Sequence, residues 1–152
     1  MKSLSDPACL REILDRLSLM RADSPRLWGR MNAHQMICHV ADSYRAVMGR
    51  KSVSMAERKF SARLIKWVAL NVPMHWPRGF PTRPEMDQEK LGTPPGDFDA
   101  DLHEVILLTE EFARPPRSFT FAPHPMFFEM TEAEWMRWGY LHVDHHLRQF
   151  GR

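Results

Sequence analysis

Two histidines near the carboxyl end of the chain, His142 and His146, are one helical turn apart in a stretch without proline. At about 100° per residue, both imidazoles lie on one face of a helix, together with Trp135 and Trp138. This can be an ordinary core helix, but two adjacent buried imidazoles without partners would cost about 1–3 kcal/mol each. Neutral ring nitrogens at i and i+4 can instead bind one divalent ion, with His142 and His145 at i and i+3 as the alternative pair. The spacing therefore predicts a metal site that needs a third ligand.

His39 meets the requirement for this third ligand. It lies in a predicted helix over 33–49 that follows the capping residue Asn32. Met36 and Val40 share its side of that helix, so His39 belongs to an otherwise largely apolar stripe. Helical bundles build metal sites from side chains that project inward from facing helices. A histidine on this stripe is therefore placed to complete the ligand set.

Capping residues and apolar residues at helical spacing predict an all-α chain. Pro7 follows a helix-start residue, and Thr131 with Glu134 forms a predicted capping box. The expected architecture is a four-helix bundle with helices near 6–20, 33–49, 98–114 and 131–150.

A fifth helix is predicted over 54–70, in the long middle crossover, because Ser54 and Glu57 have capping-box spacing. Its apolar stripe contains Phe60, Leu64, Trp67 and Val68, and its other side contains Arg58, Lys59, Arg63 and Lys66. Such a helix can lie on a membrane surface, but packing on the bundle or on a second subunit is the commoner explanation. We therefore expect no membrane association, and a homodimer that buries this stripe.

The segment 71–96 is rich in proline and is predicted to be a long loop. Loops of this length inside compact domains often cover or bind substrates, and aromatic residues indicate that this one packs down in part. The candidate substrate-contacting residues are Trp76, Arg78, Phe80 and Arg83.

Composition narrows the class of protein. The 152 residues are expected to form one domain, 1–152, and the formal charge of +2 comes from basic and acidic residues that are interspersed throughout. No concentrated basic face is present, so we expect no nucleic-acid partner. The first residues lack the apolar core of a signal peptide, which predicts a cytoplasmic protein. Cys9 and Cys38 are isolated and are expected to be small core residues.

An early-helix His39 followed by His142-Val-Asp-His145-His146-Leu-Arg-Gln149 resembles the DinB/YfiT-like superfamily of metal-dependent enzymes. The resemblance implies a four-helix bundle, often dimeric, in which His39, His142 and His146 bind a divalent metal, commonly zinc or nickel. It also implies transfer of low-molecular-weight thiols to small-molecule substrates, or hydrolysis. The inserted helix and the proline-rich loop depart from that pattern, so no particular substrate carries over.

Three neutral imidazoles leave a divalent ion with an open position for water or substrate, which is typical of catalytic sites. Such an ion lowers the pKa of a bound water or thiol to about 7. The predicted function is therefore a metal-dependent transferase or hydrolase, and the alternative is a non-catalytic bundle in which His145 or Asp42 completes a structural site. Candidate residues around the ligands are Gln35, Asp42, His145 and Gln149. The remaining histidines, His34, His75, His103 and His124, are expected on the surface or in loops.

Overall fold

Helices make up nearly all of the regular structure of this chain. The structure, a computed structural model, describes residues 1–57 and 61–152. In chain order the elements are α1 (Pro7–Ser18), α2 (Ala33–Val47), α3 (Ala62–Asn71), the short 3-10 helix η1 (Pro84–Met86), α4 (Phe98–Ala113) and α5 (Glu132–Gln149). The described residues form no strand, only one isolated bridge between His124 and Phe128. The prediction of an all-helical chain is therefore confirmed.

The four α-helices other than α3 agree with the predicted helices to within two residues at each end. Each begins after a side-chain oxygen that accepts a hydrogen bond from a backbone N–H of the first turn, which otherwise has no partner. These caps are Asp6, Asn32, Asp97 and Thr131, and two of them form reciprocal capping boxes, with Gln35 and Glu134.

Helix α3 begins at Ala62, eight residues later than the predicted start at 54. The Ser54–Glu57 capping box is therefore wrong. The Ser54 hydroxyl instead donates to Glu85 and accepts from Arg83, so it belongs to the contacts of the long loop. A capping-box spacing identifies a helix start only when no other polar partner competes for the hydroxyl.

Much of the apolar side of α3 is exposed. Leu64 is 64% exposed and Trp67 is 58% exposed, whereas Leu70 is buried. The predicted stripe residue Phe60 and the basic residues Arg58 and Lys59 lie outside the described residues. No helix in the described part of the chain is both long and apolar enough to cross a membrane.

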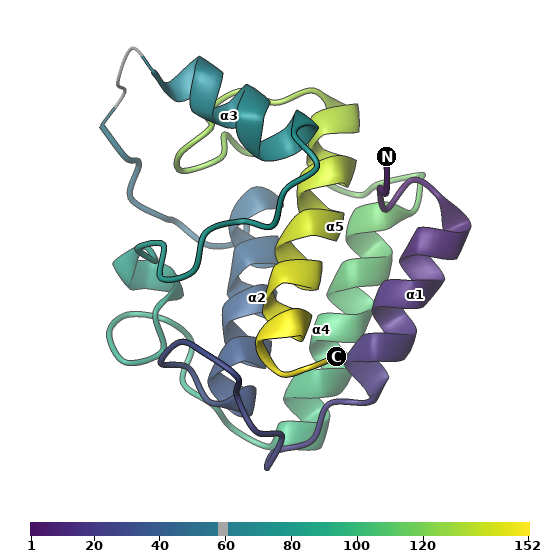
Figure 1. The fold of residues 1–152 in the computed structure, drawn as a ribbon, viewed down its shortest axis with the longest axis vertical. Helices are drawn as coiled ribbons and strands as arrows, with labels where there is room; N and C mark the ends of the chain where they lie inside the picture. The colour runs from purple at the N-terminus through teal and green to yellow at the C-terminus, as the bar shows by residue number, and fades with distance from the viewer. Residues whose placement is uncertain (58–60) are drawn as a thin grey trace.

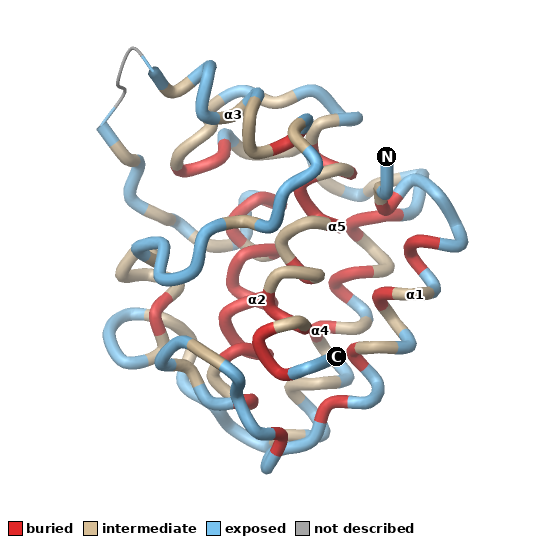
Figure 2. The backbone as a smooth tube through the Cα atoms, viewed as in Figure 1, coloured by how far each residue is buried: buried red, intermediate tan, exposed pale blue. Residues whose placement is uncertain are grey.

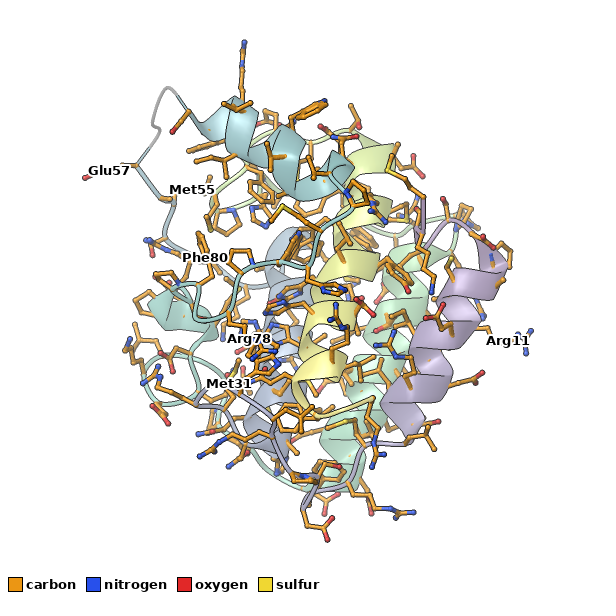
Figure 3. The ribbon with its side chains drawn as sticks, viewed as in Figure 1. Arg11, Met31, Met55, Glu57, Arg78 and Phe80 are labelled. Carbon is orange, nitrogen blue, oxygen red and sulfur yellow. The ribbon has the colours of Figure 1, made fainter. Side chains whose placement is uncertain are left out.

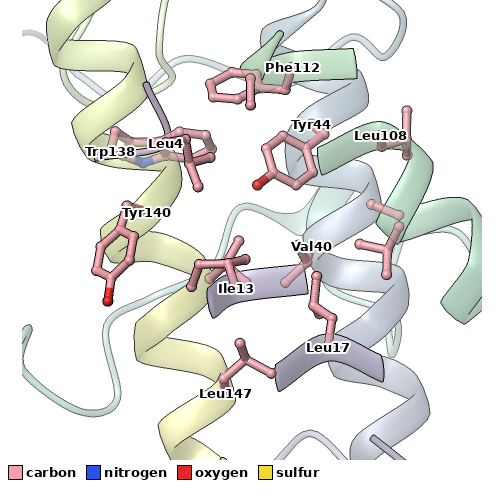
Figure 4. Close-up of a cluster of buried hydrophobic side chains, with 14 of the residues drawn as sticks. Leu4, Ile13, Leu17, Val40, Tyr44, Leu108, Phe112, Trp138, Tyr140 and Leu147 are labelled. Atoms are coloured by element: carbon pink, nitrogen blue, oxygen red, sulfur yellow. The ribbon is translucent and has the colours of Figure 1, made fainter. Parts of the chain in front are cut away.

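The core lies where α1, α2, α4 and α5 run side by side, with α3 across one end (Figure 1). Buried residues concentrate on the facing sides of these helices (Figure 2). Trp138 of α5, Tyr44 of α2 and Phe112 of α4 meet in the cluster shown in Figure 4. Gly139 allows this close approach, because a Cβ there would lie 2.7 Å from carbon atoms of Leu4 and Phe112. The packing therefore fixes how α5 faces its neighbours.

The segment 72–96 leaves the end of α3, passes over α2 and α5, and turns back through η1 to reach α4 (Figure 1). The indole N–H of Trp76 donates to the carbonyl oxygen of Ala69, which holds the first part of the segment against α3. This segment and α3 together cover the side of α2 and α5 on which the histidines lie.

Candidate metal centre

Helices α2 and α5 bring three imidazoles together. His39, His142 and His146 each have a ring nitrogen within 4.8 Å of the other two. The ring centroid of His39 is 5.4 Å from that of His142 and 4.7 Å from that of His146. The centroids of the two α5 rings are 4.8 Å apart. The i, i+4 pair and the histidine of α2 thus meet at one point.

The Nδ1 atom of His39 lies 2.8 Å from the backbone carbonyl oxygen of Met86, in η1. Because a carbonyl oxygen only accepts, Nδ1 carries the proton and the lone pair is left on Nε2. No sequence pattern predicts this contact, since any residue type at 86 would supply a carbonyl. The long loop therefore orients the imidazole of α2.

His146 is oriented in a similar way by Gln149, whose Oε1 lies 3.2 Å from Nδ1 of His146. The Nε2 group of Gln149 donates to the carbonyl oxygen of Trp28, at 2.9 Å, which fixes which end of the amide faces the ring. Nδ1 of His146 is therefore the protonated nitrogen, and Nε2 is left to face the other histidines. Such contacts around a ligand fix its tautomer and orientation.

His142 is held by stacking. Its ring lies on the indole of Trp138, with centroids 4.8 Å apart and an angle of 15° between the planes, and Trp76 is 6.3 Å away on the loop side. His142 remains partly exposed because the pocket described below opens onto it, whereas His39 and His146 are buried.

The environment keeps these imidazoles neutral at neutral pH. Burial lowers the pKa of His39, although its hydrogen bond to the Met86 carbonyl opposes this. Burial and the neighbouring histidines hold the pKa values of His142 and His146 well below the usual range. A neutral imidazole is the form that binds a metal, so protons do not compete for these nitrogens near pH 7.

The arrangement fits a divalent ion. Two of the three rings have the outer nitrogen hydrogen-bonded and the inner nitrogen free, which is the arrangement usual for metal-bound histidine. Imidazole nitrogen is a good ligand for zinc and nickel. Within the described residues, no fourth metal-binding side chain joins the group.

A pocket of about 940 Å³ opens onto the three histidines. Its walls come from α2, α5, α3, the loop and the segment 124–127. Phe80, Arg78 and Met31 follow one another along this side of the molecule, from the α3 end toward the opposite end (Figure 3). The volume lies in the range of small-molecule sites.

The candidate loop residues differ in their contacts. Trp76 and Phe80 line the pocket, and Phe80 is 55% exposed. Arg83 also lines it, but one of its Nη groups donates to the Ser54 hydroxyl and the Met55 carbonyl. Arg78 is exposed at the rim, where its guanidinium lies 5.3 Å from the centre of the Trp28 ring.

The four residues predicted to surround the ligands also differ in what they contact. Gln149 contacts His146 as described above, and His145 lies between Trp28 and Trp76, with ring centroids 4.8 and 6.1 Å away. Burial, with the charge of Arg148 next, lowers the pKa of His145 to about 4. His145 is outside the three-histidine group, so the i, i+3 pair is not the one assembled.

Among the hydrogen bonds of the described residues, none joins Gln35 or Asp42 to a histidine ring. The Gln35 side chain accepts from the Asn32 backbone as part of the helix cap. The fully buried Asp42 carboxylate accepts from the backbone N–H and the hydroxyl of Thr93, both at 2.7 Å. A position one turn from a ligand does not determine a contact, because the path of the loop decides which partner the side chain meets.

A second group of metal-ligand residues, His34, Cys38 and Asp101, joins α2 to α4. Nε2 of His34 lies 2.7 Å from Oδ2 of Asp101, and the same oxygen accepts from the Cys38 thiol and the Gly96 backbone N–H. Burial and the Asp101 carboxylate raise the pKa of Cys38 to about 12, so this thiol is not a nucleophile at neutral pH. The i, i+4 spacing of His34 and Cys38 is the signal that could have predicted this group.

Three of the remaining histidines are placed as expected and one is not. His75 and His103 are exposed and His124 lies in a loop, where it is buried, but His34 is half-buried in α2. Nδ1 of His124 accepts from the backbone N–H groups of Met126 and Phe127, and its ring packs on Trp138. Its place between two prolines predicted a loop but carried no signal of burial.

The comparisons with known proteins correct the family assignment. A family model described as "Protein of unknown function (DUF1569)" matches residues 8–152. No curated protein and no solved structure matches the chain. The assignment to the DinB/YfiT-like superfamily is wrong, because the family that matches is a distinct one. The match covers nearly the whole chain, which therefore belongs to the DUF1569 family.

Proposed function

We propose that the protein is a metal-dependent enzyme that acts on a small molecule, with His39, His142 and His146 holding one zinc or nickel ion. The observation that carries this proposal is the orientation of the rings, since two outer nitrogens are hydrogen-bonded while the inner ones converge. Convergent free lone pairs on buried rings are unfavourable unless something binds between them.

The reaction class follows from what such an ion supplies. Bound there, it would lower the pKa of a water or thiol to about 7, which serves either hydrolysis or thiol transfer. The chain's own residues orient the ligands through Met86 and Gln149, and Trp76 covers the rings on the pocket side. The superfamily resemblance no longer supports a thiol substrate. The support that remains is the ability of a bound divalent ion to lower the pKa of a thiol.

The alternative is a structural metal site in a non-catalytic protein. A fourth protein ligand would favour it, but His145 stays outside the group and Asp42 is held by Thr93. The pocket that opens onto the rings favours the enzyme. In this proposal α1, α2, α4 and α5 act as a four-helix bundle, and α3 with the long loop acts as an insertion that shapes the pocket.

The test is the metal content of protein purified without chelators or metal columns. We expect about one divalent ion per chain in the wild type by mass spectrometry and less than about a tenth of that for His142→Ala. His145→Ala is the matched control, because it removes a neighbouring imidazole from outside the group, and it should keep its ion. Equal metal content in the wild type and His142→Ala would contradict the assignment.

We also propose a homodimer that buries the exposed side of α3. Leu64, Ile65 and Trp67 lie within one turn of α3 and are each about half exposed or more, and exposed apolar side chains grouped in this way commonly mark an interface. Light scattering at micromolar concentration should give twice the chain mass of 17.9 kDa, and Trp67→Glu should give the single-chain mass. A single-chain mass for the wild type would exclude the dimer.

A further inference from the structure

The lining of the pocket combines apolar side chains on the α3 side with a few charged residues. Toward α3 the lining is apolar, with Leu64, Val68, Met74, Met126 and Phe127. The charged lining residues are Arg30, Arg83, Asp87 and Lys90, and Asp87 follows Met86, the residue that orients His39. Three of these four are cations and one is an anion, so the lining has an excess of positive charge.

Most of this positive charge is already paired. Arg30 makes ion pairs with Asp87 and Glu89, and Lys90 also pairs with Asp87. Arg83 makes no ion pair within the described residues; one of its Nη groups donates to Ser54, whose hydroxyl in turn donates to Glu85, and its Nε is buried without a hydrogen-bond partner. These cations therefore hold the loop together.

Arg78 differs from Arg30 and Lys90. Among the ion pairs of the described residues, none includes Arg78, and its guanidinium lies over the Trp28 ring at 5.3 Å. Trp28 in turn contacts His145, so Arg78 belongs to the histidine end of the pocket. Its neighbours Pro77 and Gly79 line the pocket, and Figure 3 shows it beyond Phe80 from α3. An arginine stacked on an aromatic ring keeps its donors directed outward for a planar anion.

We propose that the ligand of this pocket is an amphipathic carboxylate, whose head group binds Arg78 at the histidine end and whose apolar body lies along α3 and 126–127. The inference rests on the proposed function only in taking this pocket as the substrate site. An uncharged apolar molecule would leave Arg78 unpaired beside it, and a short polar anion would leave the apolar walls in contact with water. An amphipathic anion matches both ends.

The test uses octanoate as the probe, with octan-1-ol and butyrate as comparison ligands, by calorimetry on the zinc-loaded protein. Octanoate should bind at least about tenfold more tightly than either, because octan-1-ol lacks the charge and butyrate lacks four methylenes, each worth about fourfold when buried. Octan-1-ol binding as tightly as octanoate would overturn the anionic head group. Butyrate binding as tightly would overturn the apolar body.

Variants test which residues bind the head group and the apolar body of the ligand. Arg78→Gln should weaken octanoate about tenfold, whereas Lys90→Gln, which removes an ion-paired cation from the same loop, should weaken it less than twofold. Val68→Thr, which makes the apolar wall polar with little change of shape, should weaken octanoate severalfold and leave butyrate unchanged. Equal losses for Arg78→Gln and Lys90→Gln would remove Arg78 as the anion-binding residue.

Zinc content separates this inference from the proposed function. Arg78→Gln should bind as much zinc as the wild type, since it touches none of the three histidines. Wild-type protein that holds zinc but does not distinguish octanoate from octan-1-ol would overturn the carboxylate and leave the metal site standing. Protein that binds octanoate selectively without binding zinc would support the carboxylate and overturn the metal enzyme.

Discussion

Helix α2 carries polar side chains on two faces, and the faces differ in how these side chains are satisfied. One face presents His34, Cys38 and Asp42 to residues 87–101, and the other presents His39 to α5. On the first face, carboxylates accept hydrogen bonds from thiol, hydroxyl, imidazole and backbone donors. On the second face, imidazoles approach one another with lone pairs between them.

The comparison shows why metal-ligand residue types alone do not identify a site. His34, Cys38 and Asp101 have types and distances that suit an ion as well as the three histidines do. Their polar atoms already bind one another, so this group needs no ion and acts as a link between α2 and α4. The three-histidine group lacks such internal pairing, because two neutral acceptors facing each other cannot form a hydrogen bond.

The largest expected effect is a loss of stability when the carboxylate on the first face of α2 is replaced. Asp42→Asn should lower the free energy of unfolding by about 3 kcal/mol, because it leaves Arg45 and Lys51 without their buried partner and turns a donor toward Thr93. Urea unfolding measures this loss, and metal content should not change. Asp15→Asn, at an exposed position on α1 outside its first turn, is the control and should be neutral. If Asp42→Asn proved as stable as Asp15→Asn, Asp42 would not be the anchor of the loop.

Helical periodicity predicted the part of the site that depends on one or two helices. His142 and His146 share a face because they are four residues apart, and the Thr131 cap sets where α5 begins. The facing position of His39 followed from the apolar stripe of its own helix. These relations are local or depend on burial, so both can be predicted from the residue types and their spacing.

The remaining contacts of the site depend on the path of the long loop, which helical periodicity does not predict. Asp42 is one turn from His39, yet its partner is Thr93, 51 residues away in the chain. The orientation of His39 depends on a backbone carbonyl of η1, which any residue type would provide. His124 is buried through its turn and its packing on Trp138, neither of which its flanking prolines indicate.

The smaller expected effect is a difference in the pH range over which each side of α2 loses its contribution to stability. Burial would raise the pKa of Asp42, but hydrogen bonds from Thr93 and the nearby cations hold it below 3.8, so its contribution to stability is lost only as the pH falls below that value. Burial lowers the pKa of His124, on the pocket side, to about 3. Its unfolded value is about 6.5, so the unfolded chain takes up a proton first and stability declines as the pH falls from 6.5 toward 3.

His124→Asn isolates this proton. An asparagine oxygen can accept the backbone N–H groups of Met126 and Phe127 in place of Nδ1 but does not titrate. In metal-free protein between pH 6 and 5, where most carboxylates are still ionised, the wild type should lose stability more steeply than the variant, by about 1 kcal/mol per pH unit. Urea unfolding at each pH measures both slopes, and Asp42→Asn should keep the wild-type slope in this range. Parallel slopes for the wild type and His124→Asn would mean that His124 is already charged in the folded protein. The histidines around the pocket would then not all be neutral, because His124 is the most buried of them outside the three ligands.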